Sequence, residues 1–523
     1  MISDAAHLVR LARAGFVFAR EGVFSLVDTR GLPLGAVWAI KLGRIIERPD
    51  VGSGTNRLAA ALTRLGPTYV KLGQFLATRP DVVGTAIARD LESLQDRLPP
   101  FPQQDAERAI AAAFDRPVAA TYASLGPPVA AASIAQVHRA EIEKDGARHP
   151  VAVKILRPGI ERRFRSDLDA FYFAARRGEA MSAEGRRLRL VEIVATLDRS
   201  VRLEMDFRLE AAALSEMAEN TRDDPDFRVP TVDWDRTARD VVTMEWVDGT
   251  PLHDRETLIA RGFDLPDLGR KVIQSFLRHA LRDGFFHADM HPGNLFVDAD
   301  GRLVAVDFGI MGRLGPKERR FLAEILFGFI TRDYRRTAQV HFDAGYVPPQ
   351  HSVDDFAQAI RAIGEPIHNR TAEDISMAKL LMLLFEVTGL FDMRTRPELI
   401  LLQKTMVVVE GVARALDPRL DMWTTADPVV RDWIARNLGP VGKLEEAASG
   451  VGAIGHFLGE IPGLLTRAGG VLERIDALTR NGHVLAPESV EAIARAQAEN
   501  QVWKTAGLWV IALMLFWIAW MLT

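Results

Sequence analysis

Hydrophobic positions near the amino terminus recur at helical spacing. The apolar residues that share this spacing of three or four positions are Leu58, Leu62, Leu65, Tyr69, Leu72 and Leu76. Such a repeat places the side chains on one face of a helix. Gly66-Pro67 interrupts the run, and proline is tolerated in the first turn of a helix. The pattern therefore predicts a helix that ends at Leu65 and a second that begins at Pro67.

The hydrophobic pattern changes after the LPPFP segment at 98–102, which marks a boundary or linker. Short runs rich in β-branched and apolar residues predict strands, and they are VAVKI (151–155), VVTMEWV (241–247), NLFVD (294–298) and LVAVDFG (303–309). Longer runs with helical periodicity cover 267–284 and 318–330. Strands that come early and helices that come late predict an α+β fold with two lobes.

The end of the sequence is apolar over a length that could cross a bilayer. Residues 505–523 contain no charge. As a helix they would extend roughly 28 Å, close to the hydrocarbon thickness of about 30 Å. Trp503, Trp509, Trp517 and Trp520 lie near the two ends, and Lys504 precedes the run. Tryptophan prefers the membrane interface and basic residues stay on the cytoplasmic side, so we expect one carboxyl-terminal span with the body in the cytoplasm.

Composition and charge narrow the classes of partner. The chain has 523 residues, of which 48% are hydrophobic and 26% charged, and its formal net charge is −4. This composition is typical of a globular protein, and the absence of a basic block argues against nucleic acid as a partner. The sequence has no cysteine, which excludes disulfides and thiolate metal sites. The first residues lack an uninterrupted apolar stretch, so we expect no cleaved signal peptide.

The segment HADMHPGN at 287–294 allows two interpretations. His287, Asp289 and His291 alternate, as metal ligands on a strand could. Asp289 and Asn294 instead match the D-x-x-x-x-N spacing of a kinase catalytic loop. A zinc site would leave Asn294 without a role, whereas the kinase interpretation uses it. The second interpretation is therefore favoured, with the histidines in supporting positions.

The residues that phosphoryl transfer needs occur in kinase order. Lys154 closes VAVK on an expected strand and would contact the phosphates of a nucleotide, and Glu210 is the best candidate for its ion-pair partner. Asp289 would orient the attacking hydroxyl or accept its proton. Asn294 and Asp307, the latter in Asp-Phe-Gly, would hold Mg²⁺. Each motif is weak alone, but together they indicate a Mg²⁺- and ATP-dependent enzyme.

Two features depart from an ordinary protein kinase. The segment PVAAASIAQVHRA at 128–140 stands where a glycine-rich loop is expected. An alanine Cβ restricts the positive φ angles and the close approach that glycine permits, so this loop should handle nucleotide differently, unless it is simply the start of a helix. No A-P-E motif follows Asp307. The long interval between Lys154 and Glu210 leaves room for inserted helices.

As an ordered set, these motifs resemble the UbiB family of atypical kinase-like ATPases linked to ubiquinone biosynthesis. The matching segments are KLGQ (71–74), AAAS (130–133), VAVK (151–154), EMD (204–206), HADMHPGN, DFG and the apolar tail. The resemblance covers nearly the whole chain. Bacterial relatives often end in two spans, whereas this sequence predicts one.

The resemblance implies further site residues. It assigns Lys71 and Gln74 to a catalytic K-x-G-Q helix that folds over the active site and excludes protein substrates. It makes Glu204 and Asp206 the E-x-D acids and Glu210 the partner of Lys154. The nucleotide-binding residues that it implies are Ala130, Ala131, Ala132, Ser133, Lys154, Glu245 and Val247. Lys71, Gln74 and Thr78 share one polar stripe at helical spacing, so Lys71 would approach one of these acids or a phosphate.

The same resemblance gives an expected organisation. The domains would be a helical amino-terminal extension (1–110), a kinase-like first lobe with inserted helices (111–250), a kinase-like second lobe (251–430), a helical extension (431–504) and a transmembrane anchor (505–523). The expected location is the bacterial inner membrane. The implied partners are membrane lipids, isoprenoid quinone precursors and other enzymes of ubiquinone synthesis, with room for a homodimer.

Two other functions are compatible with these motifs. Small-molecule phosphotransferases of the aminoglycoside or choline kinase type have a similar H-x-D-x-x-x-x-N loop, although the K-x-G-Q helix and the tail speak against them. A non-catalytic, nucleotide-gated scaffold for biosynthetic enzymes is the third hypothesis. All the catalytic groups are present, so the sequence does not require it.

Overall fold

The computed structural model describes most of the chain up to residue 438. The described residues are 2–26, 40–41, 43–48, 57–77, isolated positions between 83 and 94, 99–181, 183–367, 387, 389–393 and 397–438. The expected transmembrane anchor at 505–523, nearly all of the expected extension at 431–504 and Thr78 lie outside them. Within the described part, no helix has both the length and the hydrophobicity to span a membrane. Residues 1–211 and 232–246 belong to one compact unit, and residues 212–231 and 247–438 to a second.

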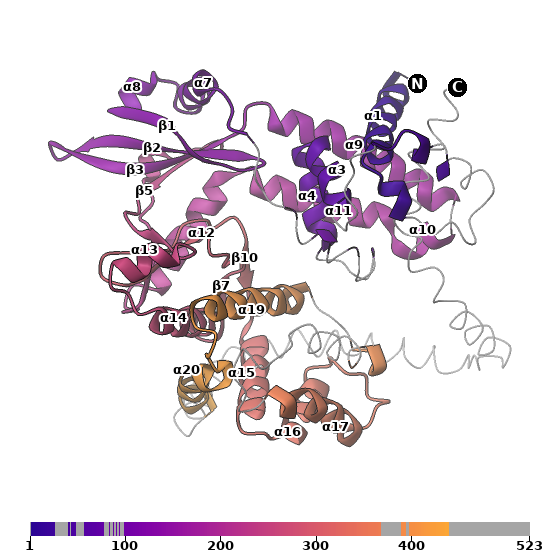
Figure 1. Cartoon of the computed structure of the whole chain (residues 1–523), viewed down its shortest axis with the longest axis vertical. Helices are drawn as coiled ribbons and strands as arrows, with labels where there is room; N and C mark the ends of the chain where they lie inside the picture. Colours follow the sequence, from indigo (N-terminus) through magenta and orange to yellow (C-terminus); the bar gives the residue numbers. More distant parts are fainter. Residues whose placement is uncertain are drawn as a thin grey trace, which may run out of the picture. The chain divides into compact units, whose positions relative to one another are not determined.

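The first unit is built on a four-stranded antiparallel sheet in the order β1-β2-β3-β5 (Figure 1). Its strands are β1 (Ser124–Ala131), β2 (Ala135–Lys144), β3 (Ala147–Leu156) and β5 (Val241–Glu245). Helices α7 (Gln103–Phe114) and α8 (Val118–Thr121) precede the sheet, and α7 packs against β3 and β5. Ile110, Val153 and Ile155 are fully buried in the shared core. The alternating apolar residues of β3 thus anchor the strand that carries Lys154.

Helices make up the rest of the first unit. They are α1 (Ile2–Arg20), η1 (Val23–Leu26), α3 (Arg57–Leu65), α4 (Pro67–Ala77), α9 (Ile160–Met181), α10 (Ala183–Leu188), α11 (Leu190–Glu204) and η2 (Trp234–Arg236), followed by the first residues of α12 (Phe207–Asn220). The predicted break between Leu65 and Pro67 is confirmed. Gly66 adopts a φ of +103°, which favours glycine. Helices α9, α10 and α11 fill the interval between β3 and α12, as the long spacing from Lys154 to Glu210 suggested.

One buried carboxylate on α9 links two amino-terminal helices, α1 and α4, to the inserted ones. Thr68 Oγ1 of α4 donates to Asp167 Oδ2 at 2.7 Å, and Arg10 Nη1 of α1 donates to Asp167 Oδ1 at 3.2 Å. Arg163, also on α9, donates to the carbonyl oxygen of Leu65 at 2.8 Å. Satisfied polar groups of this kind fix helix positions that apolar packing alone would leave adjustable. The helix α4 is therefore held in a defined place against α9.

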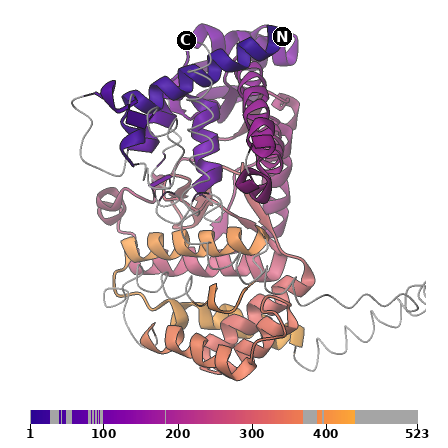
Figure 2. The same ribbon diagram turned by 90° about the vertical axis from the view of Figure 1, so that its right-hand side faces the viewer.

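The second unit contains two small sheets and a group of helices (Figure 2). Strands β4 (Phe227–Arg228), β9 (Leu303–Ala305), β8 (Leu295–Val297) and β6 (Thr250–Pro251) form one sheet, and β10 (Met311–Arg313) pairs with β7 (Phe285–His287). The helices are α13 (Arg255–Ala260), α14 (Leu265–Arg278), the π-helical turn η3 (His279–Asp283), α15 (Pro316–Ile330), α16 (Tyr334–Asp343), α17 (Val353–Gly364), η4 (Glu365–Ile367), α19 (Pro397–Leu416) and α20 (Met422–Leu438).

Close packing of α14 on α19 forms the centre of the helical part of the second unit. Figure 2 shows the two helices side by side. A Cβ at Gly269 would lie 3.1 Å from the carbonyl oxygen of Ala413, so glycine allows the two backbones to approach. Val272, Ile273 and Phe276 of α14 are buried. This packing fixes α19, which contacts the loop that carries Asp289.

Candidate functional site

The predicted pair of Lys154 and Glu210 is formed in the first unit. Lys154 Nζ donates to Glu210 Oε1 at 2.7 Å, and the two side chains are only 13% and 7% exposed. Lys154 is fixed because it pairs with Val137 on β2 and Val242 on β5. Glu210 lies in the first turn of α12, where the helix dipole favours a negative charge. This arrangement holds a cation at the end of a rigid strand.

The Ala-rich segment forms the tip of the β1–β2 hairpin, so the helical alternative does not hold. Ala130 and Ala131 pair with Val137 and Gln136 on β2. Ala132 and Ser133 form the turn, in which the Ala132 amide donates to the carbonyl oxygen of Ala135 at 2.8 Å. The turn therefore stands where the loop over nucleotide phosphates stands in kinases.

The K-x-G-Q helix α4 is bound to α11 through its lysine. Lys71 Nζ lies 2.6 Å from Glu204 Oε2, and both side chains are mostly buried. Of the two acids that the sequence left open, Glu204 is thus the partner of Lys71. Asp206 pairs instead with Arg208 at 2.7 Å, and this interaction lowers the pKa of Asp206.

Glycine and glutamine complete the K-x-G-Q motif in different ways. A Cβ at Gly73 would overlap side-chain atoms of Leu62 and Leu94, so glycine is required for close packing of α4. Gln74 is half-buried on the same helix. The expected hinge residues Glu245 and Val247 lie at the end of β5 and just after it, and both are half-buried.

In the second unit, His287 supports the loop that carries Asp289. The Asp289 amide donates to His287 Nδ1 at 3.0 Å, so the ring proton belongs on Nε2. The ring meets Phe308 of the Asp-Phe-Gly motif edge-on, with centroids 5.2 Å apart. Burial lowers the pKa of His287, which keeps it neutral. These contacts make His287 a structural link between the two motifs.

Asp289 and Asn294 lie together, as their spacing predicted. Asn294 Nδ2 donates to the Asp289 carboxylate at 3.2 Å and to its main-chain oxygen at 3.1 Å. Asp289 itself is exposed. His291 is exposed as well, and its Nδ1 accepts from the Gly293 amide at 3.2 Å, so it shapes the turn. The carboxylate at 289 is therefore accessible and oriented.

Asp307 stands at the other end of the hairpin that Asn294 begins. Strands β8 and β9 pair antiparallel, and the Val306 amide donates to the carbonyl oxygen of Asn294 at 3.1 Å. Asp307 Oδ1 accepts from the Gly309 amide at 3.0 Å. A carboxylate and an amide oxygen are the ligand types that Mg²⁺ prefers. The donor set formed by Asp307 and Asn294 thus fits the expected ion.

Thr405 is a site-supporting residue that sequence reasoning missed. It is fully buried on α19, and its Oγ1 lies 3.1 Å from the carbonyl oxygen of Ala288 and 2.8 Å from that of Leu401, so its one hydroxyl hydrogen is shared between the two acceptors. The contact joins α19 to the residue directly before Asp289. Thr405 occurs in an apolar helical run, so nothing in the local sequence indicated the contact.

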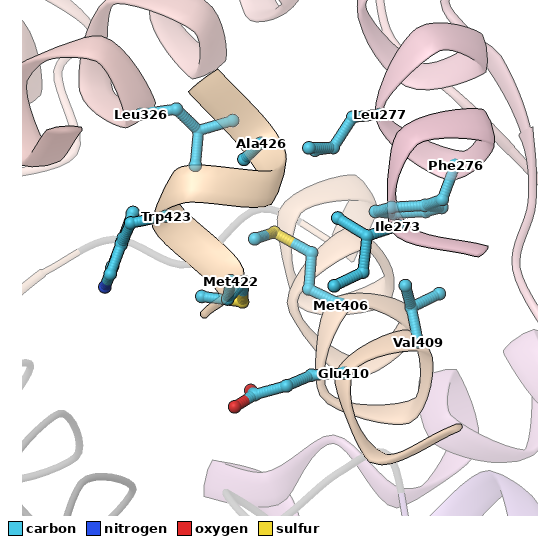
Figure 3. Close-up of a pocket in the computed structure, with 10 residues that line it drawn as sticks. All are labelled: Ile273, Phe276, Leu277, Leu326, Met406, Val409, Glu410, Met422, Trp423 and Ala426. Atoms are coloured by element: carbon cyan, nitrogen blue, oxygen red, sulfur yellow. The ribbon is translucent and has the colours of Figure 1, made fainter. Parts of the chain in front are cut away.

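A small cavity in the second unit is separate from these residues. It has a volume of about 20 Å³ and lies between α14, α15, α19 and α20 (Figure 3). Figure 3 shows the carboxylate of Glu410 pointing away from the apolar side chains of Ile273 and Phe276. Burial raises the pKa of Glu410. Ligand pockets measure about 300 Å³ or more, whereas this volume suits about one water molecule.

Buried histidines make the fold sensitive to acid. His138 is fully buried, its Nδ1 lies 2.8 Å from the carbonyl oxygen of Gly126, and its Nε2 lies 2.8 Å from Gln136 Nε2. The ring therefore donates to Gly126 and accepts from Gln136. Burial lowers the pKa of both His138 and His341. Protonation of His138 would put a hydrogen on Nε2, which would then face the amide hydrogens of Gln136 Nε2.

We expect the free energy of unfolding to fall as the pH drops below about 6.5, the usual histidine pKa. In that range the unfolded chain binds protons that the folded chain does not, so acid favours unfolding. Urea unfolding at about pH 7.5 and 5.5 would measure the loss, and His138→Gln should reduce it. His149→Gln, at an exposed position, is the control. An equal loss in the wild type and in His138→Gln would contradict the assignment.

Two protein-family models and curated relatives match this chain. The model of the ABC1 atypical kinase-like domain matches residues 93–341, and that of the UbiB helical domain matches residues 360–421. A protein of Marinobacter nauticus named "Probable protein kinase UbiB" is 41% identical over 446 residues, which cover 84% of this chain and 81% of the relative. One of Azotobacter vinelandii with the same name is 40% identical over 459 residues, which cover 86% of this chain and 84% of the relative.

A solved structure was also found. It is titled "The complex structure of Rv3197-erythromycin from Mycobacterium tuberculosis" and has a TM-score of 0.47 and 24% identity, covering 76% of this chain and 98% of that chain. The two family models and the long, closely similar relatives account for both the kinase-like motifs and the helices that follow them. The chain belongs to the UbiB family of ABC1 atypical kinase-like proteins and has a protein-kinase-like fold.

Proposed function

We propose that this protein is a membrane-anchored atypical kinase or ATPase that uses Mg²⁺ and ATP to support ubiquinone biosynthesis. The observation that carries the proposal is the buried ion pair of Lys154 and Glu210, 2.7 Å apart. Lys154 and Glu210 are far apart in sequence and form a mostly buried pair. Removing their two charges from water costs free energy. That cost is understandable when the pair positions an ammonium group for phosphate oxygens.

Each predicted residue has a definite task in this proposal. Lys154 binds phosphate oxygens, and Glu210 keeps its ammonium group in place. Asp289 is exposed and accepts the proton of the attacking hydroxyl, while Asn294 orients its carboxylate. Asn294 and Asp307 would hold Mg²⁺, which supplies charge neutralisation for the phosphates when it is bound.

Three features favour water or a lipid over a protein as the phosphoryl acceptor. The Ala-rich turn replaces the usual glycine-rich loop, and no A-P-E motif follows Asp307. Helix α4 is fastened by the ion pair of Lys71 and Glu204, as expected of a lid that does not open for a polypeptide. The apolar segment 505–523 would anchor the protein in the bacterial inner membrane, next to isoprenoid quinone precursors and the enzymes that convert them.

Phosphate release by the purified full-length protein tests the proposal. With Mg²⁺ and ATP we expect saturable release that increases when vesicles contain isoprenoid quinone precursors. Asp289→Asn should remove both the basal and the stimulated release, because an amide cannot accept the proton.

Two outcomes would contradict the proposal. Equal release by the wild type and by Asp289→Asn would exclude this site as the source. Phosphorylation of a soluble amino alcohol that persists after deletion of residues 505–523 would favour a small-molecule phosphotransferase instead.

A further inference from the structure

The turn at the tip of the β1–β2 hairpin is held from both sides by one residue, Arg157. The Arg157 amide donates to the carbonyl oxygen of Ile134 at 2.7 Å. Its side-chain Nη2 donates to the carbonyl oxygen of Ala132 at 3.2 Å. Ser133, between these two carbonyls, is fully buried. Arg157 lies directly after β3, three residues beyond Lys154, so the strand that carries the lysine also fixes the turn.

The same guanidinium group reaches the segment that leads into α7. Arg157 Nη2 donates to the carbonyl oxygen of Pro99 at 3.0 Å, and the guanidinium lies 5.3 Å from the ring centroid of Phe101. Gln136 holds this segment independently, because its Oε1 accepts from the Phe101 amide at 2.9 Å. The segment 99–101 is thus a fixed point to which Arg157 ties the Ala-rich turn.

The chemistry of these contacts requires arginine. One nitrogen, Nη2, uses its two hydrogens for two carbonyls on different segments, while the guanidinium carbon lies over the ring of Phe101. A lysine could not place a planar cation over the ring and hold both carbonyls with the same geometry. Among the described residues, no acidic group contributes to the pKa of Arg157, which is lowered by burial and by the nearby Arg163. Within the described part of the chain, the guanidinium bonds main-chain oxygens and forms no ion pair.

We propose that Arg157 is a positioning residue for nucleotide, because it sets the conformation of the Ala-rich turn by bridging Ala132 to Pro99. The inference rests on the proposed function, in which this turn covers the phosphates. Loss of the bridge leaves Lys154, Glu210 and Asp289 intact but frees the turn to adopt other conformations. Mg²⁺-ATP then has to order the turn when it binds, and the lost conformational entropy weakens its binding.

Steady-state kinetics of Arg157→Gln test the proposal. The KM for Mg²⁺-ATP should rise about tenfold, as expected for the loss of two charge-assisted hydrogen bonds, while kcat changes less. Arg157→Lys keeps the charge and one hydrogen bond, so it should restore part of the affinity. Arg162→Gln removes an exposed arginine of α9 and should leave KM unchanged.

A double-mutant cycle separates positioning from general stability. Ala131→Gly loosens the end of β1 that leads into the same turn, so its effect on KM and that of Arg157→Gln should be strongly non-additive. A residue that only stabilises the fold would lower the unfolding temperature without such coupling. If Arg157→Gln does not fold, the cycle is made with Arg157→Lys.

The possible failures can be told apart. A wild type without saturable Mg²⁺-ATP hydrolysis and without stabilisation by Mg²⁺-ATP would overturn the proposed function. A wild type that saturates, together with arginine variants of unchanged KM or additive effects, would overturn the role of Arg157 alone.

Discussion

Replacing Lys154 with alanine should abolish the thermal stabilisation of the protein by Mg²⁺-ATP and lower its turnover about a thousandfold, or roughly 4 kcal/mol. The ammonium group is the cation that β3 presents, and it is mostly buried at 2.7 Å from Glu210. Its removal takes away the attraction for phosphate oxygens and leaves the carboxylate of Glu210 to repel them. Nucleotide-dependent shifts of the unfolding temperature measure binding, and phosphate release measures turnover. An unchanged thermal shift would contradict the role of Lys154.

The same substitution should also destabilise the nucleotide-free protein. Glu210 is 7% exposed, and the substitution removes an ammonium group 2.7 Å from its mostly buried carboxylate. Breaking a buried ion pair costs about 3–5 kcal/mol. The double variant Lys154→Met/Glu210→Gln removes both charges and should be more stable than Lys154→Ala. If the double variant has a lower free energy of unfolding than Lys154→Ala, an unpaired charge at Glu210 is not the cause of the destabilisation.

Asp307→Asn should remove Mg²⁺-dependent turnover, by about a thousandfold, with little change in stability. The amide keeps the shape of the side chain and can still accept the hydrogen bond from the Gly309 amide, so the local turn should persist. It lacks the negative charge that a hard cation requires. Phosphate release over a range of Mg²⁺ concentrations measures the effect. Asp300→Asn, at an exposed position of the same hairpin, is the control.

The cellular result of Asp307→Asn decides between catalysis and scaffolding. If the variant protein fails to restore ubiquinone synthesis in cells that lack the gene, phosphoryl transfer or hydrolysis is required. If it restores synthesis while the purified variant shows no turnover, the protein acts as a non-catalytic scaffold. Protein levels of the variant and the wild type must be compared in the same cells, since marginal losses of stability change abundance.

Local signals were sufficient for several parts of the fold and the site. Gly66-Pro67 located a helix boundary because glycine and proline act on their own backbone. The order of VAVK, D-x-x-x-x-N and Asp-Phe-Gly predicts Lys154, Asp289 and Asp307 as site residues, because phosphoryl transfer needs that set. The pairing of Lys154 with Glu210 followed from the same chemistry and is confirmed.

Other contacts could not be read from the sequence because they join segments whose local patterns are unrelated. Thr405 looks like any threonine in an apolar helix, yet its hydroxyl contacts the carbonyl oxygen of the residue before Asp289. Arg157 binds two main-chain carbonyls, and any residue type can supply such an acceptor, so the sequence does not indicate the contact. The sequence left Lys71 open between Glu204, Asp206 and a phosphate. In the structure Lys71 pairs with Glu204, whereas Asp206 pairs with Arg208.

The carboxylate of Asp167 couples the amino-terminal helices α1 and α4 to the inserted helix α9. Because it accepts from Arg10 on α1 and Thr68 on α4, the extension before the kinase-like domain and the insertion within it share one polar junction. Moving α4 apart from α9 would break the hydrogen bond from Thr68 and leave the mostly buried carboxylate with Arg10. We therefore expect any motion of α4 to be coupled to α9, so that the extension and the inserted helices shift together.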